Sequence, residues 1–130
     1  MIGLDTTVLI DIHKKDPHVF EKLEELEEEF ILNDLIYLEL TVGINTQKET
    51  HKKEQALYDE YFDTLTTIAL SKTAAKKTRD IIWQAKKQQK TIHLLDATIA
   101  GIYLANNVKK ILTRNKKDFE NIPELDVITY

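Results

Sequence analysis

The sequence contains no cysteine, only three glycines and two prolines, and no long hydrophobic run. Without cysteine there is no disulfide scaffold, thiol nucleophile, zinc finger or iron–sulfur cluster. So few glycines and prolines predict short connections between abundant regular elements. No apolar run approaches the roughly 18 residues of a membrane span, and no basic leader opens the chain. We therefore expect a cytoplasmic protein with no membrane partner.

Length and composition are those of an ordinary globular chain. The 130 residues are 42% hydrophobic and 31% charged, which predicts a single domain spanning 1–130 and argues against disorder. The formal net charge of −4 provides no overall attraction to a polyanion. The charge is unevenly spread: residues 21–29 contain six glutamates and one lysine, whereas residues 72–90 contain seven basic residues and one aspartate. A polyanion would have to bind through the second region.

Short apolar segments alternate with helical patterns along the chain. We expect strands at residues 2–4, 30–32, 66–70, 111–113 and 127–130. We expect helices at about 6–14 (with Thr6 or Thr7 as its cap), from Pro17 onward, and at about 35–46, 49–65, 72–90 and 94–106. This alternation predicts an α/β fold of three layers, α/β/α, with a central parallel sheet. Ligands of such folds bind at the carboxyl ends of the strands.

Four carboxylates either follow a predicted strand or interrupt an apolar helix. Asp5 follows strand 2–4, and Asp118 comes after strand 111–113. Glu39 lies on an apolar helix, and Asp96 stands at the start of another. Taken singly, each has a simpler explanation: a helix cap for Asp5 and Asp96, a loop residue for Asp118 and a satisfied core residue for Glu39. Taken together, all four can point into one crevice at the strand ends.

Several carboxylates in one pocket raise one another's pKa unless cations neutralise them. Oxygen ligands without histidine or thiolate select Mg²⁺ or Mn²⁺, and such ions can activate water and hold a phosphodiester for in-line attack. The four histidines show no zinc-ligand spacing. No GxxxxGK[ST], GxGxxG or GxSxG motif occurs, so nucleotide-binding loops and a serine hydrolase lack support.

In their order and spacing these segments resemble the PIN domain, and most closely the VapC-type toxins of toxin–antitoxin pairs. LDTTVLID at 4–11 is similar to the opening motif of the family, and YLEL at 37–40 carries the glutamate where the family places one. LLDATIAG at 94–101 resembles the central motif and LTRNKKDF at 112–119 the last. The match spans nearly the whole chain.

The resemblance implies a metal-dependent endoribonuclease. It assigns metal binding to Asp5, Glu39 and Asp96, and it leaves open whether Asp118 is the fourth ligand with Asn115 assisting. Whether these residues bind one metal ion or two stays open. Thr6 and Thr113 match hydroxyl positions that support the acidic cluster, although both also suit a helix cap and a strand end. The resemblance further implies a small antitoxin that blocks the site, and a homodimer.

Two groups of basic residues offer contacts for RNA. Arg114, Lys116 and Lys117 flank the proposed metal site and are the stronger candidates for phosphate contacts. A helix over 72–90 would also present a basic stripe around Trp83, formed by Lys72, Lys76, Arg79, Lys86, Lys87 and Lys90. The simpler explanation of this stripe is a solvated helix face.

Two other functions remain open from the residues alone. A catalytically silent PIN-like module would bind RNA or a protein without cleaving it, and Asn115, where an aspartate is common, points that way. A metal-dependent phosphatase of the haloacid dehalogenase type is disfavoured because no aspartate stands two residues after Asp5.

Overall fold

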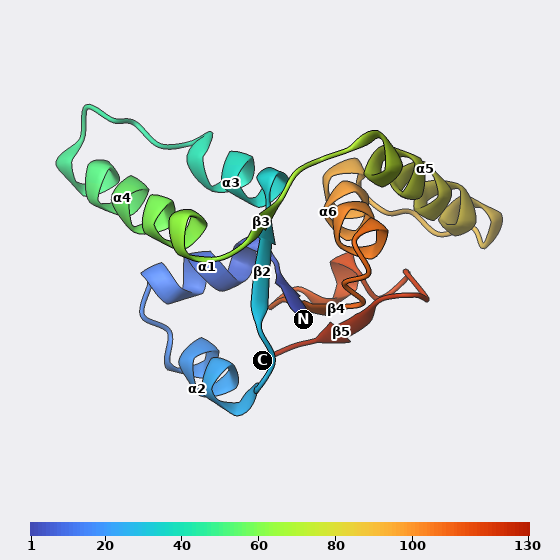
Figure 1. Ribbon diagram of the computed structural model, residues 1–130, viewed down its shortest axis with the longest axis horizontal. Helices are drawn as coiled ribbons and strands as arrows, with labels where there is room; N and C mark the ends of the chain where they lie inside the picture. The colour runs from blue at the N-terminus through green and yellow to red at the C-terminus, as the bar shows by residue number, and fades with distance from the viewer.

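The computed structural model describes all 130 residues and contains one five-stranded sheet flanked by helices (Figure 1). All strands pair in parallel, in the order β3-β2-β1-β4-β5. The strands are β1 Ile2–Leu4, β2 Phe30–Asn33, β3 Thr67–Ile68, β4 Lys110–Leu112 and β5 Asp126–Ile128. The predicted parallel sheet is confirmed.

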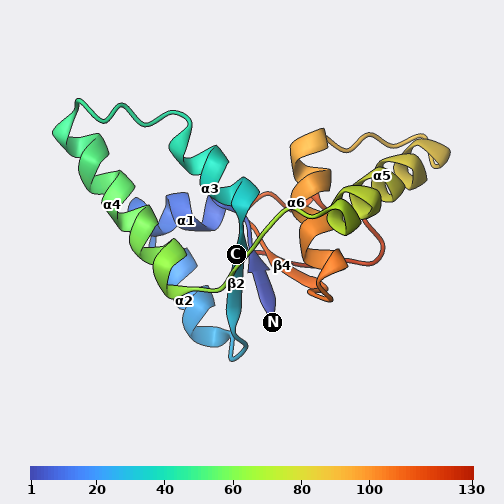
Figure 2. The same ribbon diagram turned by 45° about the horizontal axis from the view of Figure 1, so that its top comes forward.

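Helices fill every connection except the last, which holds a short 3₁₀ helix. They are α1 Thr6–His13, α2 Pro17–Glu25, α3 Asp34–Thr41, α4 Glu49–Thr64, α5 Lys72–Lys87, α6 Leu94–Ala105 and η1 Lys116–Asp118. Helices α1 to α4 lie on one side of the sheet and α5 and α6 on the other (Figures 1 and 2). The predicted α/β class is confirmed. None of these helices is both long and apolar enough to cross a membrane.

Several predicted boundaries were wrong. The helix expected to reach residue 46 ends at Thr41, where the chain turns and Val42 is left 77% exposed with no core to pack against. The strand expected over 66–70 shrinks to Thr67–Ile68, a sheet edge that pairs on one side only. The helix expected to reach residue 90 ends at Lys87. Helix boundaries depend on what the terminal turn packs against, which propensity does not record.

The start of α1 also differs from the prediction. Asp5 occupies the N-cap position, and Thr6 and Thr7 are already helical. The two threonine hydroxyls bond to carboxylates instead of capping the helix. By contrast, the Asn33 side chain caps α3, its Oδ1 accepting from the Leu35 backbone N–H at 3.0 Å.

Tyr103 of α6 fixes that helix against the middle of the sheet. Its fully buried hydroxyl donates to the Leu4 carbonyl at 2.6 Å, and the Ile31 carbonyl lies 3.2 Å from the same oxygen. The ring covers Gly3, where an added Cβ would stand 2.5 Å from a ring carbon. A glycine is therefore required here by close approach. The contact sets the position of α6 relative to β1.

The strand order places a crevice at the centre of the sheet. From β1 the chain proceeds to β2 and β3 in one direction and to β4 and β5 in the other. At such a switch point the connections leave toward opposite faces, so an opening remains outside the carboxyl ends of the two central strands. Here those strands are β1 and β4, paired through Leu4 and Leu112.

Candidate active site

Asp5 and Thr113 follow the two strands that border the switch point. Asp5 is only 4% exposed. Its Oδ2 accepts from the Thr113 hydroxyl at 2.7 Å and from the Thr7 hydroxyl at 3.0 Å. Burial raises the pKa of Asp5, and the two hydroxyl donors oppose that shift. Both side-chain donors therefore go to the same oxygen, Oδ2.

Glu39 faces Asp5 from α3. Its side chain is half-buried, and its Oε1 accepts from the Thr6 hydroxyl at 2.9 Å. Desolvation raises the pKa of Glu39, with further increases from the charges of Asp5 and Asp118 and an opposing effect from Thr6. The predicted supporting position of Thr6 therefore corresponds to a direct contact with a cluster carboxylate.

Asp96 lies in the first turn of α6, and Asp118 ends η1. Partial burial raises the pKa of Asp96 to about 6, and the charges of Asp118, Asp5 and Glu39 add to this shift. The neighbouring His93 lowers it. Helices α3 and α6 stand on either side of the carboxyl edge of the central strands (Figures 1 and 2).

The four predicted carboxylates therefore act on one another electrostatically. No three carboxylate or histidine groups stand close enough together to hold a metal ion with the side chains as they lie. Yet Asp5 and Asp118 raise the pKa of both Glu39 and Asp96. Mutual repulsion among oxygen donors is what a divalent cation would relieve, so the donor set fits Mg²⁺ or Mn²⁺.

The segment after β4 forms one wall of the site. A hollow of about 450 Å³ is lined by Arg114, Asn115, Lys116, Lys117 and Asp118. The Asn115 backbone N–H donates to the Thr113 hydroxyl at 3.0 Å, which fixes the direction of this loop. Lys116 and Lys117 are exposed beside the acidic cluster.

Arg114, predicted from the sequence to contact an RNA phosphate, forms an ion pair with Asp11 in this structure. Its Nη1 donates to Asp11 Oδ1 at 2.9 Å, and the Tyr130 hydroxyl donates to Asp11 Oδ2 at 2.6 Å. Asp11 is buried, so this pair ties the loop and the chain end to α1. Arg114 is thus engaged in an ion pair while its side chain stays 44% exposed, and phosphate contacts of Arg114, Lys116 and Lys117 stay a prediction.

Three residues around the candidate site were not predicted from the sequence. The Thr7 hydroxyl donates to Asp5 Oδ2 and accepts from the Arg114 backbone N–H at 3.1 Å. Asp11 is an acid among apolar residues, the same signal that singled out Asp96, and it lies four residues after Thr7 on one helix face. No sequence signal marked Tyr130.

The fold and site define a class of protein: an α/β domain with an acidic cluster at its topological switch point. The model of the PIN domain family matches residues 2–125, and the chain belongs to that family. It is 31% identical to Ribonuclease VapC from Rickettsia bellii (strain RML369-C) over 128 residues, which cover 97% of this chain and 93% of that protein.

Solved structures share the fold at lower sequence identity. VapBC2 from Rickettsia felis, bound to a promoter DNA fragment, superposes with a TM-score of 0.83 at 22% identity, covering 100% of this chain and 99% of the other. DNA-bound VapBC from Salmonella typhimurium gives a TM-score of 0.82 at 20% identity, covering 99% and 98%. These likenesses establish the PIN/VapC-like fold.

Proposed function

We propose that this protein is an Mg²⁺- or Mn²⁺-dependent endoribonuclease that hydrolyses RNA phosphodiester bonds, acting in the cytoplasm as the toxin of a toxin–antitoxin pair. The observation that carries the proposal is the group of four carboxylates at the switch point, in which the pKa values of Glu39 and Asp96 are raised first by desolvation and further by the charges of Asp5 and Asp118. The 31% identity to Ribonuclease VapC supports RNA as the substrate.

The metal ligands would be Asp5, Glu39, Asp96 and Asp118, with Asn115 beside the last. A bound ion would neutralise the cluster and would supply a Lewis acid for activating water and for stabilising charge on the phosphate. These four carboxylates offer only oxygen donors, which suits a hard cation. Whether one ion or two is bound follows from the stoichiometry of a calorimetric titration.

The chain's own residues position these groups. Thr113 and Thr7 hold Asp5 Oδ2, so that the carboxylate has one orientation before substrate binds. Thr6 restrains Glu39 in the same way. Lys116 and Lys117 would contact phosphates beside the scissile bond, because they flank the cluster and are exposed.

The first test is cleavage of a mixed RNA pool with Mg²⁺, with Mn²⁺ and with EDTA. We expect metal-dependent cutting by the wild type. Asp5→Asn, Asp96→Asn and Glu39→Gln should lower the rate by about 100-fold or more, because each removes a charged ligand. Asp63→Asn, an exposed aspartate of α4, is the matched control and should cleave like the wild type.

Normal cleavage by the three cluster variants would contradict the proposal. If no protein cleaves and Mn²⁺ leaves the wild-type melting temperature unchanged, the chain is a silent binding module instead. If no protein cleaves but Mn²⁺ stabilises the wild type and not Asp96→Asn, the metal site stands and RNA was the wrong substrate.

We also propose a small antitoxin as partner and a homodimer as the assembly. The relatives of known structure include VapBC complexes and a toxin–antitoxin complex from Klebsiella pneumoniae. An arginine of the partner would fit the acidic cluster through charge-assisted hydrogen bonds. Adding that partner should abolish RNA cleavage, and an arginine-to-alanine change in it should restore cleavage.

A further inference from the structure

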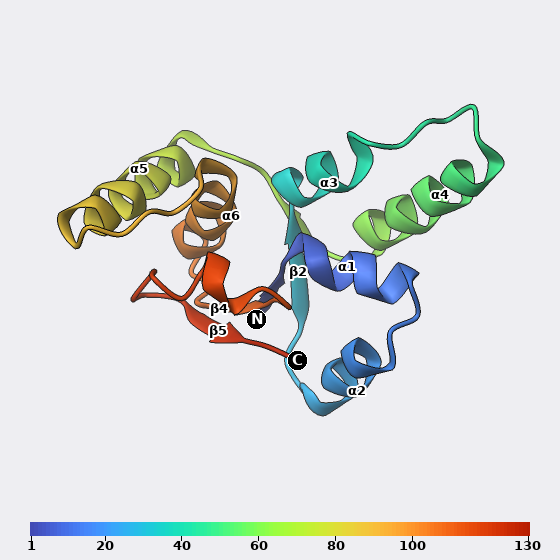
Figure 3. The same cartoon turned by 180° about the vertical axis from the view of Figure 1, so that it is seen from behind.

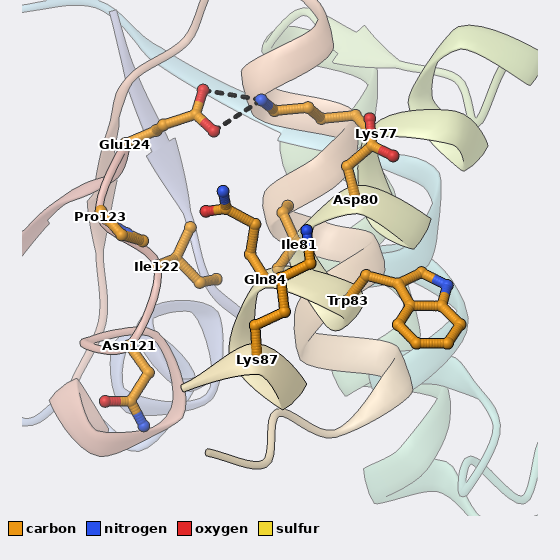
Figure 4. Close-up of a pocket in the computed structure, with 10 residues that line it drawn as sticks. All are labelled: Lys77, Asp80, Ile81, Trp83, Gln84, Lys87, Asn121, Ile122, Pro123 and Glu124. Carbon is orange, nitrogen blue, oxygen red and sulfur yellow. Dashed lines mark hydrogen bonds and ion pairs between the residues drawn. The ribbon is translucent and has the colours of Figure 1, made fainter. Parts of the chain in front are cut away.

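A second groove runs between α5 and the segment that joins η1 to β5. From behind, that segment projects toward α5 (Figure 3). The groove has a volume of about 370 Å³. Figure 4 shows the residues that line it: Lys77, Asp80, Ile81, Trp83, Gln84 and Lys87 from α5, and Asn121, Ile122, Pro123 and Glu124 from the opposite segment.

The two ends of this groove differ in charge. At one end Lys77 Nζ is bound to both carboxylate oxygens of Glu124 at 2.7 Å, which closes the groove and cancels both charges (Figure 4). At the other end Lys87 is exposed and forms no ion pair. Lys87 stands beside Gln84 on α5, with Asn121 across the groove (Figure 4).

The open end adjoins the candidate active site. Asn121 follows Asp118 by three residues, a length of chain that reaches at most about 11 Å even when extended. The chain is in fact turned here, since the Glu120 N–H donates to the Lys116 carbonyl at 2.9 Å. One segment therefore lines both the hollow at the acidic cluster and the open end of the groove.

An exposed aromatic ring lies on α5 one turn before Lys87, and it points away from the segment that carries Asn121 (Figure 4). Trp83 is 57% exposed, which is unusual for so large an apolar side chain. Lys86 Nζ lies 5.1 Å from the centre of its ring. A free cation, two amides and an exposed indole are the groups that bind single-stranded nucleic acid: phosphates on the cation, base edges on the amides and a base face on the ring.

We propose that the open end of this groove is a subsite for nucleotides of the RNA next to the cleaved bond. Lys87 contacts a phosphate, Gln84 and Asn121 contact base edges, and Trp83 stacks on a base. The proposal rests on the proposed ribonuclease function and adds a path for the substrate. An RNA occupant is favoured over a protein because Asn121, which lines this end, follows Asp118 of the acidic cluster by only three residues.

The test compares two single-stranded RNAs that share a cleavage site, one of about four nucleotides and one of about 12, matching the range of strand lengths that such surfaces cover. Lys87→Ala and Trp83→Ala should lower kcat/KM about 5-fold or more on the long RNA, and leave the short RNA nearly unaffected. In EDTA, Lys87→Ala should reduce the slope of log Kd against log salt by about 0.7 for the long RNA, because one phosphate contact is lost.

Two lysine variants serve as controls. Lys53→Ala on α4 removes the same charge from the opposite side of the sheet and should not alter the salt slope. Lys76→Ala removes a charge from the exposed stripe of α5 outside the groove. If Lys76→Ala reduces the slope as much as Lys87→Ala, the contact is diffuse and the groove proposal is overturned.

The subsite proposal and the ribonuclease proposal predict different negative results. If the wild type cleaves RNA while Lys87→Ala and Trp83→Ala match it on both substrates, the groove is not a subsite and the nuclease stands. If the wild type binds and cleaves neither RNA, the ribonuclease function fails and the subsite with it. If a purified antitoxin, rather than RNA, loses affinity for the two variants, the groove is a protein interface.

Discussion

Individual hydroxyl groups decide how the acidic cluster is arranged. Asp5 is almost fully buried, yet its Oδ2 receives two hydroxyl donors, from Thr113 and Thr7. A buried carboxylate without such donors would be protonated near neutral pH or would destabilise the fold. The hydroxyls thus oppose the rise in pKa that burial causes in Asp5, and they fix the direction of its carboxylate.

We expect Thr113→Val to weaken Mn²⁺ binding by about 10-fold, since groups that orient a metal ligand typically contribute 10- to 100-fold to affinity. Valine has nearly the same shape but cannot donate to Asp5. Isothermal titration calorimetry measures the change. Thr113→Ser keeps the hydroxyl and should bind like the wild type, and an unchanged affinity in Thr113→Val would show that Asp5 needs no such support.

Asp96 should make the metal-free protein less stable at neutral pH than in mild acid. Its pKa is about 6 in the folded protein and about 3.9 in an unfolded chain. Because the folded state binds the proton more tightly, the free energy of unfolding decreases as pH rises from about 4 to 6. In EDTA at pH 7.5, Asp96→Asn should therefore raise the melting temperature by about 3 °C.

Asp96→Asn should also flatten the pH dependence of the melting temperature between pH 5 and 7.5, as followed by circular dichroism. Asp5 and Glu39 contribute in the same direction, so part of the dependence persists. Asp63→Asn on α4 is the control and should keep the full dependence. A lower melting temperature for Asp96→Asn at pH 7.5 would mean that Asp96 is stabilising and the repulsion is absent.

At the scale of elements, the packing of α5 on α6 depends on a glycine. An added Cβ at Gly101 would lie 2.2 Å from the Thr78 hydroxyl oxygen, 3.0 Å from the Thr78 backbone nitrogen and 3.1 Å from the Ala74 carbonyl oxygen. The two helices can approach this closely only without that side chain. The contact holds α5, and with it the groove, next to the helix that carries Asp96.

We expect Gly101→Ala to lower the free energy of unfolding by about 1–3 kcal/mol, because overpacking forces the two helices apart. Gly43→Ala is the matched control, since nothing lies within 4 Å of an added Cβ there, and it should change stability by less than about 0.5 kcal/mol. Urea titrations of the three proteins provide the comparison. Equal urea midpoints for Gly101→Ala and the wild type would mean that α5 shifts without lowering the free energy of unfolding.

Which elements form was predictable, and where they end was less so. The sequence pattern predicted all six α-helices, and the side chains of Asn33 and Ser71 cap α3 and α5. Ala74, Ile81 and Ala85 of α5, which recur at the spacing of one helix face, are buried. The ends of α3 and α5 and the length of β3 were wrong, because each depends on neighbours distant in sequence.

For the whole molecule, the main prediction is coupling between metal binding and global stability. An ion that binds only the folded state at 100 times its Kd adds about 2.7 kcal/mol to the free energy of unfolding. We expect Mn²⁺ to stabilise the wild type by this amount and to leave Asp5→Asn nearly unaffected, as followed by thermal denaturation. An equal gain in both proteins would place the ion elsewhere.

The sequence by itself determined the α/β pattern and the parallel sheet, because hydrophobic periodicity is a local property, and residue type was enough to propose the four carboxylates. Only the tertiary structure decided their partners. Thr113 and Asp5 are 108 residues apart, and Tyr130 and Asp11 are 119 apart. Such pairs form when strand order and helix packing bring distant segments together. The same packing committed Arg114 to Asp11 and opened a groove beside Lys87, neither of which any local pattern encodes.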